Sequence, residues 1–113
     1  DIEHMKRTID SSLLYCMKAD LSVKSQVKAF AEFALSIDAH PSLIINNTGI
    51  FIQGKLQEEE DGVLEKLMET NVYSAYHLTR YLLPGMITKK QGTIFNICST
   101  ASITPYINGG SYC

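Results

Sequence analysis

Short apolar runs alternate with amphipathic helical stretches along this chain, and this alternation limits the possible folds more than any other feature. Apolar runs typical of strands lie at residues 13–17, 43–45 and 93–98, and helical patterns fill the intervals between them. Intervals of this length suit crossovers between parallel strands, and right-handed crossovers would place helices on both faces of the sheet. The sequence therefore predicts an α/β chain built on a doubly wound parallel sheet.

The first long helix is expected between residues 23 and 37, where apolar side chains recur at helical spacing. Ser22 is the expected N-cap, because its hydroxyl can accept a hydrogen bond from a free amide at the helix start. The residues around Pro41 are expected to end this helix. Residues 1–12 also have a spacing near helical, which predicts the end of another amphipathic helix.

A second long helix is expected to start at residues 58–60, because three glutamates suit the positive end of a helix dipole. Its apolar pattern runs on towards Pro84, with a bend near residues 70–71. Pro84 and Gly85 are expected to disturb its last turns, because proline has no amide hydrogen to donate.

The composition is that of an ordinary globular chain, and it argues against several kinds of function. The chain has 113 residues, a formal net charge of −2 and 45% hydrophobic residues, which bounds it to one domain at most. No apolar run approaches the ~20 residues of a membrane span, and no basic face indicates nucleic-acid binding. Three widely spaced cysteines favour reduced thiols in a cytoplasmic protein, and the histidines and cysteines share no metal-ligand spacing.

The two ends of the sequence predict a piece of a longer protein. The chain opens without a methionine and stops at Cys113, where another helical pattern is about to begin. Three strands are few for an independent domain, since small folds bury little of their surface. We therefore expect an incomplete sheet that lacks its first strands and its C-terminal part.

A serine and a tyrosine mark the expected site. Ser99 follows the strand-like run at 93–98, and open α/β sheets bind ligands beyond the carboxyl ends of their strands. Tyr112 comes thirteen residues later, after the flexible turn at 108–111. We expect the two hydroxyls to lie on one side of this sheet edge, where they could bind a carbonyl group together.

Four motifs, in this order and at this spacing, make the chain resemble the middle of a classical short-chain dehydrogenase/reductase. They are Asp20–Leu21, the Asn-Asn-Thr-Gly sequence at 46–49, Asn71 in its helix, and Ser99 with Tyr112. The sequence departs from the family pattern at two places. Thr48 replaces the usual alanine, and Ile-Cys-Ser at 97–99 replaces the commoner Ile-Ser-Ser. The resemblance covers nearly all of the chain.

The resemblance implies that residues 1–113 are part of a single NAD(P)-binding Rossmann-fold domain. Asp20 and Leu21 would bind the adenine, and Asn47, Thr48 and Gly49 would line the ribose side of the cofactor. The Gly-rich loop that cradles the pyrophosphate would lie upstream, at a helix N-terminus. The choice between NADP and NAD stays open, because the family reads it at a strand that would also lie upstream.

The resemblance also implies three catalytic residues and a reversible conversion between carbonyl and alcohol. Tyr112 would be the general acid or base, Ser99 would hold the substrate oxygen, and the main chain of Asn71 would hold a water of the proton relay. A free phenol has a pKa near 10, which a lysine expected three residues beyond Cys113 would lower. The implied substrate is a small carbonyl or alcohol, and the implied assembly is a homodimer or homotetramer.

Two other functions remain open from the sequence. The chain could belong to a non-catalytic relative that binds partners or acts as a scaffold, or to a relative that performs epimerisation or dehydration. Within the family, the residues at 111–113 and 99–102 are similar to the sepiapterin reductase-like group. The 113 residues alone are expected to be inactive, since the pyrophosphate loop and the lysine would lie outside them.

Overall fold

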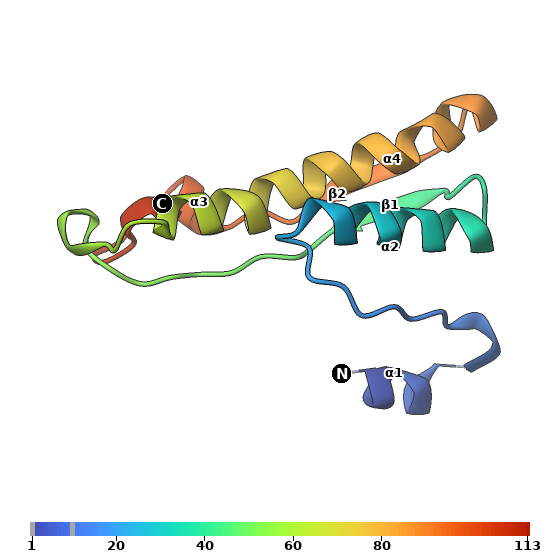
Figure 1. Cartoon of the computed structure of the whole chain (residues 1–113), viewed down its shortest axis with the longest axis horizontal. Helices are drawn as coiled ribbons and strands as arrows, with labels where there is room; N and C mark the ends of the chain where they lie inside the picture. The colour runs from blue at the N-terminus through green and yellow to red at the C-terminus, as the bar shows by residue number, and fades with distance from the viewer. Residues whose placement is uncertain (1, 10) are drawn as a thin grey trace.

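The computed structural model describes residues 2–9 and 11–113, and it contains a two-stranded parallel sheet with two long helices on one face. The helices and strands are α1 (Ile2–Thr8), α2 (Lys24–Ile37), β1 (Leu43–Asn46), α3 (Val63–Met68), the π-helical turn η3 (Glu69–Tyr73), α4 (Ser74–Lys89) and β2 (Thr93–Asn96). Short 3₁₀ turns are η1 (Ser11–Leu13), η2 (Leu56–Glu58), η4 (Thr100–Ser102) and η5 (Gly110–Tyr112). Figure 1 shows α3, η3 and α4 as one nearly continuous rod above the sheet.

The sheet consists of β1 and β2, which run parallel and in register. Leu43 lies opposite Thr93 at one end, and Asn46 lies opposite Asn96 at the other. The long α3–η3–α4 segment connects the two strands, as a crossover between parallel strands requires. Both carboxyl ends therefore meet at one edge, which confirms the parallel arrangement, although β2 ends two residues before the predicted limit of 98.

The hydrophobic core lies between the sheet and the two long helices. Its buried members are Val27, Ala31, Ile44, Leu78, Leu82 and Met86, and Ile94 of β2 packs against them. Successive strand residues point to opposite faces, so Ile45 and Phe95 point away from this core, with 55% and 54% of their surface exposed. Within the described residues β2 is therefore not the buried strand that the sequence predicted, because α2 and α4 cover the same face of the sheet.

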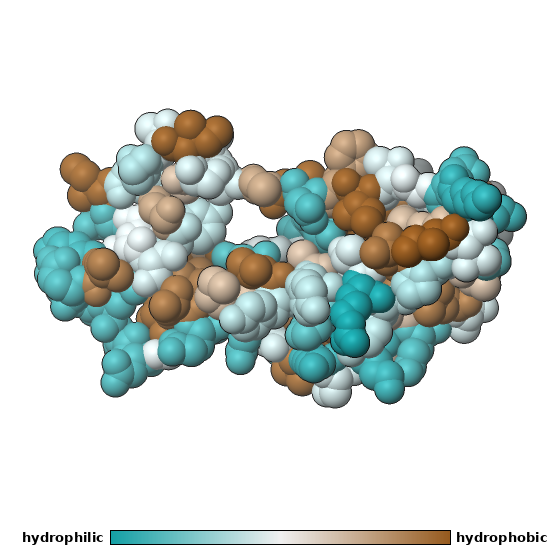
Figure 2. Space-filling view, turned by 90° about the horizontal axis from the view of Figure 1, so that it is seen from above, coloured by the Kyte–Doolittle hydropathy of each residue, from teal (hydrophilic) through white to brown (hydrophobic). Residues whose placement is uncertain are grey.

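The outer surface of the long helical rod also carries apolar side chains. Val72, Tyr73, Tyr76 and Ile87 each expose close to half of their surface or more. Figure 2 looks down on the molecule from the side of α4 and shows hydrophobic side chains between polar ones, with an opening between the two ends of the molecule. No described helix is both long and apolar enough to cross a membrane.

The strand predicted at residues 13–17 is wrong. The turn η1 includes Leu13, and residues 14–20 form neither a helix nor a strand. A strand needs a neighbour for its backbone hydrogen bonds, and Figure 1 shows this segment running well apart from β1. Leu13 and Tyr15, with 75% and 61% exposure, have no covering element among the described residues.

The start of α2 differs from the prediction, and its end agrees with it. The residue at the N-cap position is Val23, and it makes no side-chain capping bond. Ser22 instead donates two hydrogen bonds to the Asp20 carboxylate, from its amide at 3.0 Å and from its hydroxyl at 2.7 Å. The helix ends at Ile37, before Pro41, as predicted.

The second helical segment starts later than predicted. The residue before α3 is Gly62, whose φ of 93° is in the left-handed region that favours glycine. The glutamates at 58–60 lie ahead of this turn, so they do not form the first turn of the helix. No marked bend occurs near residues 70–71: the π-helical turn η3 lies there, and Figure 1 shows the helical direction continuing into α4.

Pro84 and Gly85 do not end the helix, since α4 continues to Lys89. Gly85 has a packing role instead. A Cβ atom at this position would lie 2.5 Å from the carbonyl oxygen of Ala39, so only glycine allows the connection before β1 to approach α4 so closely. The Nδ1 atom of His40 lies 3.2 Å from the carbonyl oxygen of Gly85.

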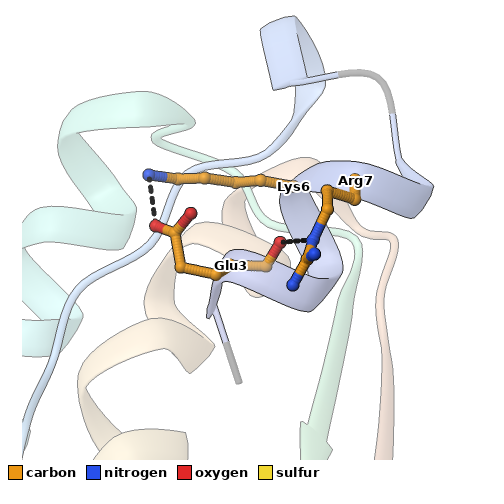
Figure 3. Close-up of polar contacts among 3 residues, drawn as sticks. All are labelled: Glu3, Lys6 and Arg7. Atoms are coloured by element: carbon orange, nitrogen blue, oxygen red, sulfur yellow. Dashed lines mark hydrogen bonds and ion pairs between the residues drawn. The ribbon is translucent and has the colours of Figure 1, made fainter.

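The N-terminal helix α1 confirms the helical interpretation of this region for residues 2–8, while Asp1 and Asp10 lie outside the described residues. Lys6 and Glu3 form an ion pair at 3.8 Å, and the Arg7 Nε donates a hydrogen bond to the Glu3 carbonyl oxygen at 3.2 Å (Figure 3). These are exposed contacts one helical turn apart, which stabilise a helix only weakly.

Candidate functional site

The carboxyl edge of the sheet is held together by a side chain from the predicted Asn-Asn-Thr-Gly motif. The Nδ2 of Asn46 donates one hydrogen bond to the Asn96 Oδ1 at 2.8 Å and another to the Thr79 Oγ1 at 3.1 Å. This amide thus joins the ends of both strands to α4. The segments that leave the two strands at this edge carry all of the remaining candidate residues except Asp20, Leu21 and Asn71.

The residues predicted to contact a cofactor are partly brought together. Leu21, Asn47 and Thr48 line one small cavity of about 150 Å³ at the end of β1. Gly49 lies beside η3, where a Cβ atom added to it would be 3.6 Å from the Asn71 Oδ1. The turn after β1 therefore lies beside Leu21 on one side and beside the α3–η3–α4 rod on the other.

Asp20 is exposed, and its carboxylate accepts the two hydrogen bonds from Ser22. These bonds, from the hydroxyl and then the amide, lower the pKa of the Asp20 carboxyl, and the positive charge of Lys66 adds to the effect. The Asp20 amide donates to the Gln26 Oε1 at 2.7 Å. The carboxylate is therefore ionised at neutral pH and held at the start of α2.

Asn71 lies in the π-helical turn and binds the segment that follows Gly49. The Ile50 amide donates to the Asn71 Oδ1 at 2.8 Å, and the Asn71 Nδ2 donates to the Ile50 carbonyl oxygen at 2.9 Å. The oxygen and the nitrogen of the Asn71 side-chain amide are thus both bonded to the main chain of Ile50. This contact explains why an asparagine, a poor helix former, lies inside a helical segment.

Ser99 follows β2 and caps the short turn η4. Its Oγ accepts a hydrogen bond from the Ala101 amide at 3.2 Å, and its carbonyl oxygen accepts one from the Ser102 hydroxyl at 2.7 Å. Because the hydroxyl is used as an acceptor, its own proton stays available for another group. Ser99 is half-buried.

A larger groove of about 630 Å³ runs along α4 beside the end of β2. Thr48 and Asn71 line it together with the strand end at 96–98, directly before Ser99. Two candidate residues, Thr48 and Asn71, thus share this groove with the segment that leads to Ser99.

Tyr112 is half-buried in η5, and its ring packs edge-on against Phe51 with 4.9 Å between the ring centroids. Tyr106 contacts the same phenylalanine at 6.0 Å. Within the described residues, no hydrogen bond joins the Tyr112 hydroxyl to the Ser99 hydroxyl. Each is held by its own set of contacts.

Sequence reasoning missed two residues that contact the tyrosine segment, Phe51 and Glu59. Both lie in the loop between β1 and α3. Phe51 belongs to no motif, and Glu59 was interpreted only as one of the glutamates at a helix start. The Glu59 carboxylate accepts hydrogen bonds from the amide and the hydroxyl of Ser111, the residue before Tyr112. The one available signal was the Gly109–Gly110 pair, since adjacent glycines often mark a close approach of the backbone to another group.

No group of three or more histidine, cysteine, aspartate or glutamate side chains is arranged to hold a metal ion among the residues that the structure describes. All three cysteines are free thiols. Cys16 is partly exposed, and Cys98 and Cys113 are exposed.

Comparison with known proteins identifies the family. The profile of the short chain dehydrogenase family matches residues 2–113. A ketoacyl reductase from Nostoc sp., HetN, is 35% identical over 82 residues, which are 73% of this chain and 29% of HetN. The uncharacterized oxidoreductase YvrD of Bacillus subtilis is 32% identical over 107 residues, which are 91% of this chain and 40% of YvrD.

Solved structures agree with this result. A metagenomic short-chain oxidoreductase crystallised with NADP is 28% identical, with a TM-score of 0.87 over 98% of this chain and 52% of its own. This likeness confirms the expected Rossmann-type, doubly wound architecture, of which the chain contains a part. The chain spans about half of that structure and well under half of the curated relatives named above. It belongs to the short-chain dehydrogenase/reductase family.

Proposed function

We propose that the protein to which these residues belong is an NAD(P)-dependent oxidoreductase, which reduces a small carbonyl compound or oxidises the matching alcohol by hydride transfer. The observation that carries this proposal is the meeting of two strand ends at one edge, where the Asn46 amide bonds to Asn96 at 2.8 Å. The turn through Gly49 and the segment leading to Ser99 both start from this edge. Residues 1–113 would be part of a single Rossmann-fold domain.

A nicotinamide cofactor, either NADP or NAD, fits the residues at this edge. The small cavity has an apolar wall at Leu21 and polar groups at Asn47 and Thr48, which suits a flat heteroaromatic ring with polar atoms at its rim. The Asp20 carboxylate keeps lone pairs that could accept a hydrogen bond from an amino group. When bound, the cofactor would supply or accept the hydride.

Tyr112 is the proposed general acid in reduction and base in oxidation. Its ring is fixed against Phe51, and its hydroxyl makes no hydrogen bond to the residues that the structure describes, so it can approach a substrate oxygen. Ser99 would donate its free hydroxyl proton to the same oxygen and stabilise negative charge there. Because the Asn71 side chain is used by Ile50, any part of Asn71 in a proton relay would come from its main chain.

The protein would assemble as a homodimer or homotetramer. The exposed apolar side chains on the outer side of α4, among them Tyr76 and Ile87, support an interface on this helix.

The test is turnover by the protein at its natural length, measured as nicotinamide absorbance with a panel of aldehydes and ketones. Tyr112→Phe should lower kcat by ~10²–10⁴-fold and leave the cofactor Kd unchanged, because it removes the proton and keeps the ring. The matched control is Tyr106→Phe, which alters the other tyrosine that packs on Phe51. Wild-type kcat in Tyr112→Phe would remove Tyr112 from the chemistry, and no turnover of any compound by the wild type would remove the proposed activity.

A further inference from the structure

We propose that Glu59 is a positioning residue for Tyr112, which it holds in place through Ser111. This inference rests on the proposed function, because it concerns the residue assigned there as the acid. Among the described residues, the Glu59 carboxylate bonds to Ser111 and not to the Tyr112 phenol. Its effect would be to fix the main chain from which the phenol extends.

Both oxygens of the Glu59 carboxylate accept hydrogen bonds from Ser111. The Ser111 amide donates to Oε1 at 2.7 Å, and the Ser111 hydroxyl donates to Oε2. Hydrogen bonds to an ionised acceptor are stronger than neutral ones, and two of them fix an orientation as well as a distance. Because the next residue is Tyr112, fixing the Ser111 amide limits the positions of the Tyr112 Cα.

The backbone beside this contact is shaped to admit the carboxylate. Gly110 has a φ of 50°, and a Cβ atom there would overlap the Glu59 Oε1 and lie 2.9 Å from the Gly54 carbonyl oxygen. The amide of Gly54 also donates a hydrogen bond, at 3.0 Å, to the carbonyl oxygen of Asn108, which is two residues before Gly110. The tyrosine segment is therefore attached to the 50–60 loop at several successive points.

The same loop also contacts the tyrosine ring. Phe51 packs edge-on against Tyr112, and the neighbouring Ile50 is fixed by its two hydrogen bonds to Asn71. Edge-to-face aromatic pairs of this kind stabilise a ring beyond the effect of burial alone. The loop thus holds the ring through Phe51 and the main chain through Glu59.

Other roles for this carboxylate find no support among the described residues. Glu59 does not cap α3, which starts at Val63 after Gly62 and has no side-chain capping bond. The nearby Lys55 pairs with Glu58 at 2.7 Å. The hydrogen-bond partner of the Glu59 side chain in this part of the chain is Ser111.

The test compares three variants of the protein at its natural length. Glu59→Ala should lower kcat about 10-fold to 100-fold with the cofactor KM nearly unchanged, because a misplacement of ~1 Å can cost about 10²-fold. Glu59→Gln should recover most of the loss, since its amide can accept from the Ser111 amide and donate to the Ser111 hydroxyl. Glu58→Ala is the matched control in the same loop, and its kcat should stay near that of the wild type.

A structural measurement separates this inference from the proposed function. Tyrosine ring resonances of the ¹³C-labelled protein, with Tyr112 assigned through Tyr112→Phe, should shift or broaden for Tyr112 in Glu59→Ala and return in Glu59→Gln. An unchanged Tyr112 resonance in Glu59→Ala would overturn the positioning role whatever the activity. Full activity in Tyr112→Phe would instead overturn the proposed function.

If Glu59→Ala does not fold, Ser111→Ala replaces it in both measurements, because it removes one of the two hydrogen bonds and keeps the carboxylate. A shifted Tyr112 resonance with a several-fold lower kcat would support the role, and wild-type values of both would overturn it.

Discussion

The substitution Gly85→Ala tests the close approach between α4 and the connection that leads into β1. In an exposed helix this change stabilises by about 1 kcal/mol, because glycine is the poorer helix former. Here the added Cβ would lie 2.5 Å from the Ala39 carbonyl oxygen and 3.4 Å from the His40 Cα. Both neighbours are main-chain atoms, so no side-chain rotation can relieve the contact.

The expected sign follows from the sizes of the two effects. Inserting a methyl group into tightly packed structure costs about 1–3 kcal/mol, and the shift should also break the contact between the His40 Nδ1 and the Gly85 carbonyl. Subtracting the helix gain of about 1 kcal/mol leaves a net loss of up to about 2 kcal/mol in the free energy of unfolding.

Chemical unfolding of the protein at its natural length measures this difference. Thr88→Ala is the control, because Thr88 is an exposed residue of the same helix and alanine should stabilise there by a few tenths of a kcal/mol. If Gly85→Ala were as stabilising as Thr88→Ala, the connection would not press on α4 and the packing argument would be refuted.

Three further outcomes follow from contacts at the site. Ser99→Ala should lower kcat by ~10²–10³-fold, which steady-state kinetics measures. It should also loosen η4, because the Ala101 amide loses its acceptor, and hydrogen exchange of the Ala101 amide measures this second effect. Asn71→Ala should cost about 2 kcal/mol in unfolding free energy, because both the amide and the carbonyl of Ile50 lose a partner, whereas exposed Thr88→Ala should not. The hydrogen bonds from Ser111 lower the pKa of Glu59 in the folded state, so its contribution to stability should be complete above the ordinary glutamate pKa and lost as the pH falls through the lowered value. The Ser111 amide chemical shift should follow this titration in the wild type, and a titration that persisted in Glu59→Gln would contradict the assignment.

The sequence was most informative where a local pattern decides the structure. The run at 43–45 became β1, and the stripe at 23–37 became α2, because burial on one side requires apolar residues at the period of the element. The family motifs at 46–49 and 99 also lie at the edge where both strands end. In both cases the determining residues are near neighbours in the sequence.

The failures have a common physical cause, which is dependence on distant partners. Residues 13–17 have the composition of a strand, yet a strand forms only beside another strand. Gly85 was expected, with Pro84, to disturb the last turns of the helix, but its packing role becomes visible only when the Ala39 carbonyl lies against α4. The glutamates at 58–60 suited a helix start, while Glu59 binds Ser111, which is 52 positions away.

The loop between β1 and α3 links the two parts of the candidate site. Asn71 fixes Ile50 at its start, Phe51 contacts the Tyr112 ring, and Glu59 near its end holds Ser111. If Tyr112 is the acid, its geometry then depends on this loop as much as on its own turn, η5. Substitutions at residues 50–60 of this loop should therefore change the rate of the chemical step more than the binding of a cofactor, whose expected contacts at Leu21, Asn47 and Thr48 lie outside these residues. Substitutions in the small cavity should have the opposite effect, because its residues do not contact the tyrosine segment.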